Sequence, residues 1–262
     1  MPDVTRLAFF GGVYSNSLAL EAALTHAKRS SADGLYALGD FGGFGPHPDR
    51  VFPILLDAGV ESIQGNYEES LSSGAEDCHC GYTDPRDNHF AQISYDYTAR
   101  KTSSEWKRWM RTLPKTRRLE VAGRKVLLVH GSPRKINEFL WESTSPVSFL
   151  EKMLADSDAD VLVCTHTGLP WTRLLPSGRR VVNAGVLGRP ANDGRTNVWY
   201  ARLTFGRDVS VEFVPVEYDH EELARRMREE RLPGEFIETV STGWWTTCLE
   251  ILPAKERERG RY

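Results

Sequence analysis

The sequence lacks the features of secreted, membrane-spanning and nucleic-acid-binding proteins. Four cysteines in 262 residues are too few for a disulfide-stabilised scaffold. No apolar run approaches the ~18 residues that cross a bilayer, and the first residues lack the basic-then-apolar order of a signal peptide. The net charge of −3 provides no basic face for nucleic acid. We therefore expect a cytoplasmic protein with neither a membrane nor a nucleic-acid partner; the oligomeric state is not indicated.

The chain does contain enough apolar residues for a sizeable core, since 40% are hydrophobic and 10% aromatic. In residues 6–66, short apolar runs alternate with helical spacing, which predicts a β-α-β-α-β unit with a parallel sheet. Residues 117–218 predict mostly antiparallel strands, so we expect an α/β fold of two sheets packed face to face with helices outside. The expected strands are 6–10, 34–40, 61–66, 117–121, 125–130, 160–165, 173–183 (a hairpin), 197–205 and 209–218, and the expected helices are 17–28, 49–57, 147–155 and 220–231.

These elements predict one domain over residues 1–219. Within it, residues 74–88 are rich in Gly, Asp and Pro and predict a loop over the strand ends, and residues 89–113 predict one or two helices. Residues 220–262 are expected to form a C-terminal helix and tail that pack on the domain.

Four polar residues each follow one of the short apolar runs: Asp40, Asn66, His130 and His166. Open α/β sheets place their ligand sites at the carboxyl ends of strands, where these residues are expected to lie. One carboxylate, one amide oxygen and two imidazoles suit Mn, Fe or Zn. The sequence therefore predicts a site for one transition metal.

The segments around these residues resemble motifs of the calcineurin-like metallophosphoesterases, in their small bacterial branch. The most specific matches are Gly-Asp-Phe-Gly-Gly-Phe-Gly-Pro at 39–46, Gly-Asn at 65–66, Val-His-Gly-Ser-Pro at 129–133 and Asn-Ala-Gly-Val-Leu-Gly-Arg-Pro at 183–190. Their order and spacing also match, from residue 6 to about residue 205. The resemblance implies a four-layer α-β-β-α sandwich of two mixed sheets that hydrolyses phosphoesters with two metals and a bridging hydroxide.

The resemblance assigns one metal a complete set of ligands and the other an incomplete set. Asp40, Asn66, His130 and His166 match the ligands of the first metal, with Asp40 as the residue that bridges both metals. The second metal loses three of its four ligands, because Gly12 and Tyr14 stand where the first motif has Asp and His, and Gly168 replaces the last histidine. A second metal is therefore doubtful.

Several residues near the incomplete half are candidates for catalysis or substrate binding. Tyr67 replaces the histidine that assists the leaving group in the family, and a tyrosine with a pKa near 10 is a weak general acid. We expect Tyr67 and Tyr14 to take part in catalysis, Asn16 to touch the substrate, and Arg189 to reach a phosphate. Tyr14 as a phenolate is also a candidate ligand for ferric iron.

The segment Cys78-His79-Cys80 lies a few residues beyond Asn66 and leaves three interpretations open. It can contact the metal, act as a substrate lid or redox element in which Cys80 touches the substrate, or be plain loop structure. Cys-x-Cys alone is a weak metal signal.

Three functions are therefore compatible with the sequence. The first is a divergent metal-dependent phosphoesterase that retains one metal and hydrolyses a phosphate mono- or diester of a small, nucleotide-like molecule. The second is a catalytically inactive relative that binds a ligand or partner, and the third is a mononuclear metal enzyme of changed chemistry. The complete first set of ligands favours the first function, whereas the loss of the second set favours the other two.

Overall fold

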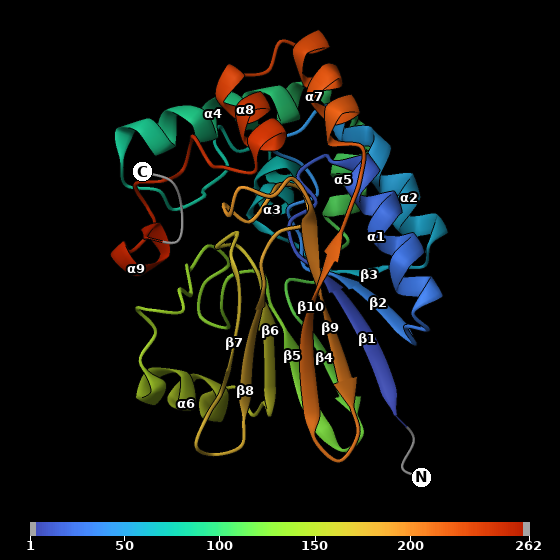
Figure 1. The fold of residues 1–262 in the computed structure, drawn as a ribbon, viewed down its shortest axis with the longest axis vertical. Helices are drawn as coiled ribbons and strands as arrows, with labels where there is room; N and C mark the ends of the chain where they lie inside the picture. The colour runs from blue at the N-terminus through green and yellow to red at the C-terminus, as the bar shows by residue number, and fades with distance from the viewer. Residues whose placement is uncertain (1–3, 259–262) are drawn as a thin grey trace.

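The structure is a computed structural model that describes residues 4–258. Its strands are β1 (Thr5–Phe10), β2 (Gly34–Ala37), β3 (Glu61–Ser62), β4 (Arg117–Val121), β5 (Arg124–Leu128), β6 (Val161–Cys164), β7 (Pro170–Leu174), β8 (Arg180–Ala184), β9 (Val198–Phe205) and β10 (Val209–Val216). They form two mixed sheets, in the orders β10-β9-β1-β2-β3 and β4-β5-β6-β8-β7 (Figure 1). In the first sheet β1, β2 and β3 are parallel, and in the second β5, β6 and β8 are parallel.

Helices flank the sheets and lie over one end of them. They are α1 (Ser17–Arg29), α2 (Val51–Asp57, after the short 3₁₀ turn Pro48–Arg50), α3 (Asn66–Ser73), α4 (Pro85–Lys101), α5 (Ser104–Met110), α6 (Val147–Asp156), α7 (His220–Glu229), α8 (Gly234–Thr242) and α9 (Ala254–Arg257). None of the helices in residues 4–258 is both long and apolar enough to span a membrane.

Side chains alternate between two faces of each central strand, which gives the molecule its layers. On β1, Leu7 and Phe9 pack toward the second sheet, whereas Ala8 and Phe10 pack on the helical side. On β5, Leu127 packs against α6 in the same manner. This period of two is the pattern of strands whose two faces are both covered. The predicted four-layer α-β-β-α sandwich of two mixed sheets is confirmed.

Some boundaries differ from the prediction for local reasons. β3 ends at Ser62, because the backbone of Gln64 bonds to Pro114 and residue 66 already begins α3. α4 begins inside the segment expected as a loop, with Pro85 at its first position and the Asp84 side chain accepting a hydrogen bond from the Arg86 backbone. Proline suits this position because its missing N–H needs no partner there.

The C-terminal segment lies over the end of the sheets at which α3, α4 and α8 gather (Figure 1). Leu223 of α7 and Phe236 of α8 pack with Phe44 and Phe90 in one buried apolar cluster. The division into residues 1–219 and 220–262 stays a prediction, and its outer ends, residues 1–3 and 259–262, lie outside the described residues. α8 and α9 were not predicted.

Candidate metal centre and adjoining cavity

The four residues expected to bind metal lie together where the two sheets end. Asp40 follows β2 and Asn66 follows β3, whereas His130 follows β5 and His166 follows β6. The first two residues therefore come from one sheet and the histidines from the other. All four side chains are buried.

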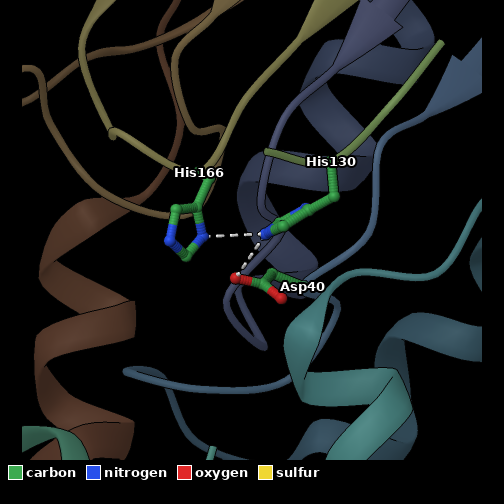
Figure 2. A group of neighbouring side chains, drawn as sticks. All are labelled: Asp40, His130 and His166. Atoms are coloured by element: carbon green, nitrogen blue, oxygen red, sulfur yellow. Dashed lines mark hydrogen bonds and ion pairs between the residues drawn. The ribbon is translucent and has the colours of Figure 1, made fainter. Parts of the chain in front are cut away.

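The ligand-type atoms converge on the Nε2 atom of His130. It lies 3.3 Å from Asp40 Oδ2, 3.1 Å from Asn66 Oδ1 and 3.1 Å from His166 Nδ1. Figure 2 shows the two imidazoles and the carboxylate around this point. One oxygen or nitrogen from each of Asp40, His130 and His166 lies within 4.8 Å of the others.

Backbone groups hold the other polar atom of each ligand, which fixes its orientation. His130 Nδ1 bonds to Leu38 O at 2.7 Å and His166 Nε2 to Cys80 O at 3.2 Å, so each ring presents its other nitrogen to the centre. Asn66 Nδ2 donates to Cys78 O at 2.8 Å, which turns its oxygen inward. Such outer partners set ring orientation and tautomer in metal sites.

The charges of the centre shift the pKa values of its members. Burial lowers the pKa of His166 to about 3, with a further contribution from His130. Burial would raise the pKa of Asp40, but His130, His166 and the backbone N–H of Tyr67 hold that pKa below its ordinary value. Burial would lower the pKa of His130, yet Asp40 raises it. An anionic Asp40 and a neutral His166 are the forms that bind metal.

This geometry fits a cation. Nε2 of His130 carries at most one hydrogen, yet three acceptor atoms lie within 3.3 Å of it, so that one hydrogen cannot satisfy all three. A cation among them satisfies all the lone pairs at once. One carboxylate oxygen, one amide oxygen and two imidazole nitrogens form a donor set for Mn, Fe or Zn.

Glu68 supports this centre and was not assigned a role from the sequence. Its buried carboxylate accepts hydrogen bonds from the backbone N–H groups of Asp40, Phe41 and Gly65, at 2.7, 2.9 and 2.8 Å. It lies at the third position of α3, and the bond to Gly65 is half of a capping box. In the sequence, the Gly-Asn-x-Glu spacing at the start of this helix was the feature that could have indicated the role of Glu68.

Strained backbone conformations cluster around the same centre. Tyr14, Ser15, Asp40, Phe44 and His166 all have φ between 51° and 70°, in the left-handed region that non-glycine residues avoid. Such residues persist where surrounding contacts over-determine them, and they gather at functional sites. Here the strain accompanies two of the expected ligands.

Other side chains lie beside Gly12 and Gly168, the positions at which the resemblance implies missing ligands of a second metal. A Cβ atom at Gly12 would lie 2.7 Å from Cε1 of Tyr14. A Cβ atom at Gly168 would lie 2.7 Å from the ring of Trp245 and 3.3 Å from Nη2 of Arg189, and the φ of Gly168 is +83°. The space next to each missing ligand is therefore occupied as well.

The two tyrosines expected to act in catalysis keep their protons. Burial, opposed by Arg189, raises the pKa of Tyr14 above its ordinary value. The raised pKa of Tyr14 disfavours the phenolate form that would bind ferric iron. Burial also raises the pKa of Tyr67, whose hydroxyl lies 2.9 Å from Ser94 Oγ. Both phenols are hydrogen-bond donors, and neither is a ready general acid.

A cavity of about 50 Å³ adjoins the centre and collects most of the candidate residues. It is lined by Asp40 and His166 together with Tyr14, Tyr67, Cys80 and Arg189. Phe236 of α8 and Thr247 and Cys248 of the C-terminal segment close another side. The cavity thus joins the expected metal ligands to the residues expected to meet the substrate.

The Cys78–Cys80 segment forms a disulfide, which was not among the interpretations of the sequence. The backbone carbonyls of both residues hold metal-centre side chains, as described above, and Asn66 Nδ2 also lies 3.4 Å from Cys80 Sγ. Because neither sulfur is a free thiolate, the segment acts on the centre through its backbone.

Asn16 has a structural role in place of the expected substrate contact. Its side-chain oxygen accepts a hydrogen bond from Ala19 N at the start of α1, and its amide nitrogen donates to Gly188 O. The side chain is fully buried and does not line the cavity. Both ends of the amide are therefore already used.

The fold is an α-β-β-α sandwich with a possible metal site where its two sheets end. Comparison with known proteins identifies its family. A family model described as calcineurin-like phosphoesterase superfamily domain matches residues 6–207. The chain belongs to this superfamily, whose members are phosphoester hydrolases.

Similar proteins span nearly the whole chain. An uncharacterized protein of Methanocaldococcus jannaschii is 24% identical over 90% of this chain and 98% of its own length. The crystal structure of a hypothetical protein of Pyrococcus horikoshii has a TM-score of 0.75 at 23% identity, and that of a metallophosphoesterase from Sphaerobacter thermophilus has 0.69 at 25%. Each structural match covers 92% of this chain and 100% of the other.

Proposed function

We propose that this protein is a phosphoester hydrolase that works with one transition metal, Mn, Fe or Zn, on a phosphate ester of a small, nucleotide-like molecule. The observation that carries the proposal is the convergence of Asp40, Asn66 and His166 on Nε2 of His130, with each outer atom held by the backbone. The superfamily supplies the reaction class.

The chain's own residues bind and orient the substrate in this proposal. When bound, a transition metal polarises a phosphoryl oxygen and lowers the pKa of a water molecule. Tyr14 and Tyr67 line the cavity and, since they stay protonated, donate hydrogen bonds to phosphoryl oxygens. The apolar wall that includes Phe44 and Phe236 excludes water, which strengthens these electrostatic contacts.

Metal content and turnover test the proposal together. Purified protein is incubated with Mn, Fe or Zn, desalted and subjected to elemental analysis, and aryl phosphate mono- and diesters are then assayed. We expect about one metal per chain, and under about a tenth in His130→Ala, because the variant loses the atom at which the ligands meet. The exposed His89→Ala variant is the matched control and should keep its metal. An unchanged metal content in His130→Ala would refute the proposal.

A ligand-binding protein without catalysis is the second candidate, and one observation favours it. Tyr14, Trp245 and Arg189 occupy the space beside two missing ligands, as they would in a site adapted to binding. Nucleotides or phosphorylated metabolites that raise the unfolding temperature of the metal-loaded protein, without turnover of any ester, would select this candidate.

A further inference from the structure

Among the residues that the structure describes, Arg189 is a buried cation without an anionic partner. Its side chain is only 6% exposed, no ion pair within residues 4–258 includes it, and its Nε atom has no hydrogen-bond partner there. Arg195, the next arginine along the chain, is exposed and pairs with Asp193 at 2.7 Å. A guanidinium taken out of water needs a compensating anion, and no carboxylate in residues 4–258 forms an ion pair with Arg189.

Aromatic rings hold the Arg189 guanidinium in place. Its Cζ atom lies 3.6 Å from the ring centre of Trp245, 5.7 Å from that of Phe44 and 5.9 Å from that of Tyr14. Trp245 is itself fixed, because its Nε1 donates to Pro190 O at 2.7 Å. Ring faces attract the cation but cannot accept all of its N–H groups, so donors remain for a ligand.

The guanidinium also lies on the side of the centre from which the second metal's ligand is missing. Its Nη2 atom is 3.3 Å from the position of a Cβ at Gly168, where the family has a histidine. It lines the same cavity as Asp40 and His166, so it faces the reacting side of the metal centre. A second metal would bring positive charge to this side of the centre, and the Arg189 guanidinium brings one positive charge to the same side.

We propose that Arg189 takes over the electrostatic role of the second metal and binds one tetrahedral oxyanion in this cavity, either the phosphoryl group of a phosphate monoester or free phosphate. This inference rests on the proposed function and narrows its substrate class. A planar guanidinium binds two oxygens of such a group at once. A cavity of about 50 Å³ beside the guanidinium has room for a phosphoryl group. A phosphate monoester carries more negative charge than a diester and therefore compensates a buried cation better.

Phosphate binding measured by titration calorimetry tests the inference without turnover. Inorganic phosphate is titrated into chelator-treated and Mn-loaded protein, for wild type, Arg189→Gln, Arg189→Lys and the control Arg195→Gln. We expect at least ~10-fold weaker binding in Arg189→Gln in both forms, an intermediate loss in Arg189→Lys, and no change in Arg195→Gln. Metal content and the unfolding temperature of each variant show that the fold and the metal centre are intact.

The outcomes separate this inference from the proposed function. Equal phosphate affinity in Arg189→Gln and wild type overturns the inference, and so does loss of metal in Arg189→Gln, because Arg189 would then act through the metal centre. A ~10-fold loss of phosphate affinity in Arg189→Gln, in a protein that takes up no metal, supports the role of Arg189 and refutes the proposed metalloenzyme.

In chelated protein, phenyl phosphate should displace phosphate and diphenyl phosphate should not. Displacement by the diester overturns the monoester assignment, and displacement by neither assigns the site to free phosphate.

Discussion

Replacing Glu68 by Gln changes one atom in the support of the metal centre and should weaken both the fold and the metal site. The Glu68 carboxylate accepts three backbone N–H groups, two at Oε2 and one at Oε1. A glutamine can keep its oxygen at the position of Oε2, which accepts the N–H groups of Asp40 and Gly65. Its NH₂ group then faces the N–H of Phe41, and that buried donor loses its acceptor.

The size of the effect follows from this count of hydrogen bonds. Burial and the nearby Asp40 raise the pKa of Glu68 to about 7, so the two proteins are compared at about pH 8, where the carboxylate is mostly charged. A hydrogen bond to a charged group contributes ~1.5–3 kcal/mol, and a buried donor left without an acceptor costs ~1–3 kcal/mol. These two contributions overlap, so we expect the unfolding free energy to fall by ~2–4 kcal/mol and the Tm to fall by roughly 5–15 °C. The donor that loses its acceptor belongs to Phe41, the residue after Asp40. The Asp40 carboxylate is then held less firmly, so metal affinity should fall ~10–100-fold.

Thermal unfolding and metal titration measure the two effects, and the neighbouring glutamate is the control. Glu69 lies next to Glu68 on α3, is 38% exposed and pairs with Lys115 at 2.5 Å. Glu69→Gln makes the same chemical change at a surface ion pair, which contributes at most ~1 kcal/mol. Equal stability and equal metal affinity in the two variants would show that the three backbone bonds to Glu68 do not hold the centre.

Two further predictions concern the segments around the centre. Reduction of the Cys78–Cys80 disulfide by a dithiol, or replacement of both cysteines by Ser, should lower metal affinity ~10-fold, because their carbonyls orient two ligands; a metal titration that does not change on reduction would contradict this. Burial, with a contribution from Glu250, raises the pKa of Asp87 to about 6, above its ordinary value of 3.8. The folded state therefore binds this proton more tightly, so the Asp87 contribution to stability is lost as pH rises from about 4 to about 6. The free energy of unfolding is measured against pH for wild type and Asp87→Asn. The difference between the two proteins should fall over this pH range, and a difference that does not change with pH would refute the prediction.

The sequence by itself determined which chemistry gathers at the strand ends. Parallel strands carry their carboxyl ends to the same edge of a sheet, so the residues after β2 and β3 had to lie near one another, and so did those after β5 and β6. The packing of the two sheets then brings the two pairs together. The period of two in β1 and the helical spacing of α1 were equally local signals, and they predicted the layers. Gly12 and Gly168 were readable as missing ligands because glycine has no ligand atom.

Only the tertiary structure decided what occupies the space beside those glycines. Trp245 and Arg189 reach Gly168 from segments distant in the chain, and no local pattern of apolar or charged residues encodes such a contact. The same holds for the carbonyls of Cys78 and Cys80, which hold ligands from α3 and from the end of β6. Backbone groups look alike in every sequence, so their partners are set by the packing of the folded chain. Residue types and their order specify the candidate metal ligands, whereas packing of remote segments places the Arg189 guanidinium and the Trp245 ring beside Gly168.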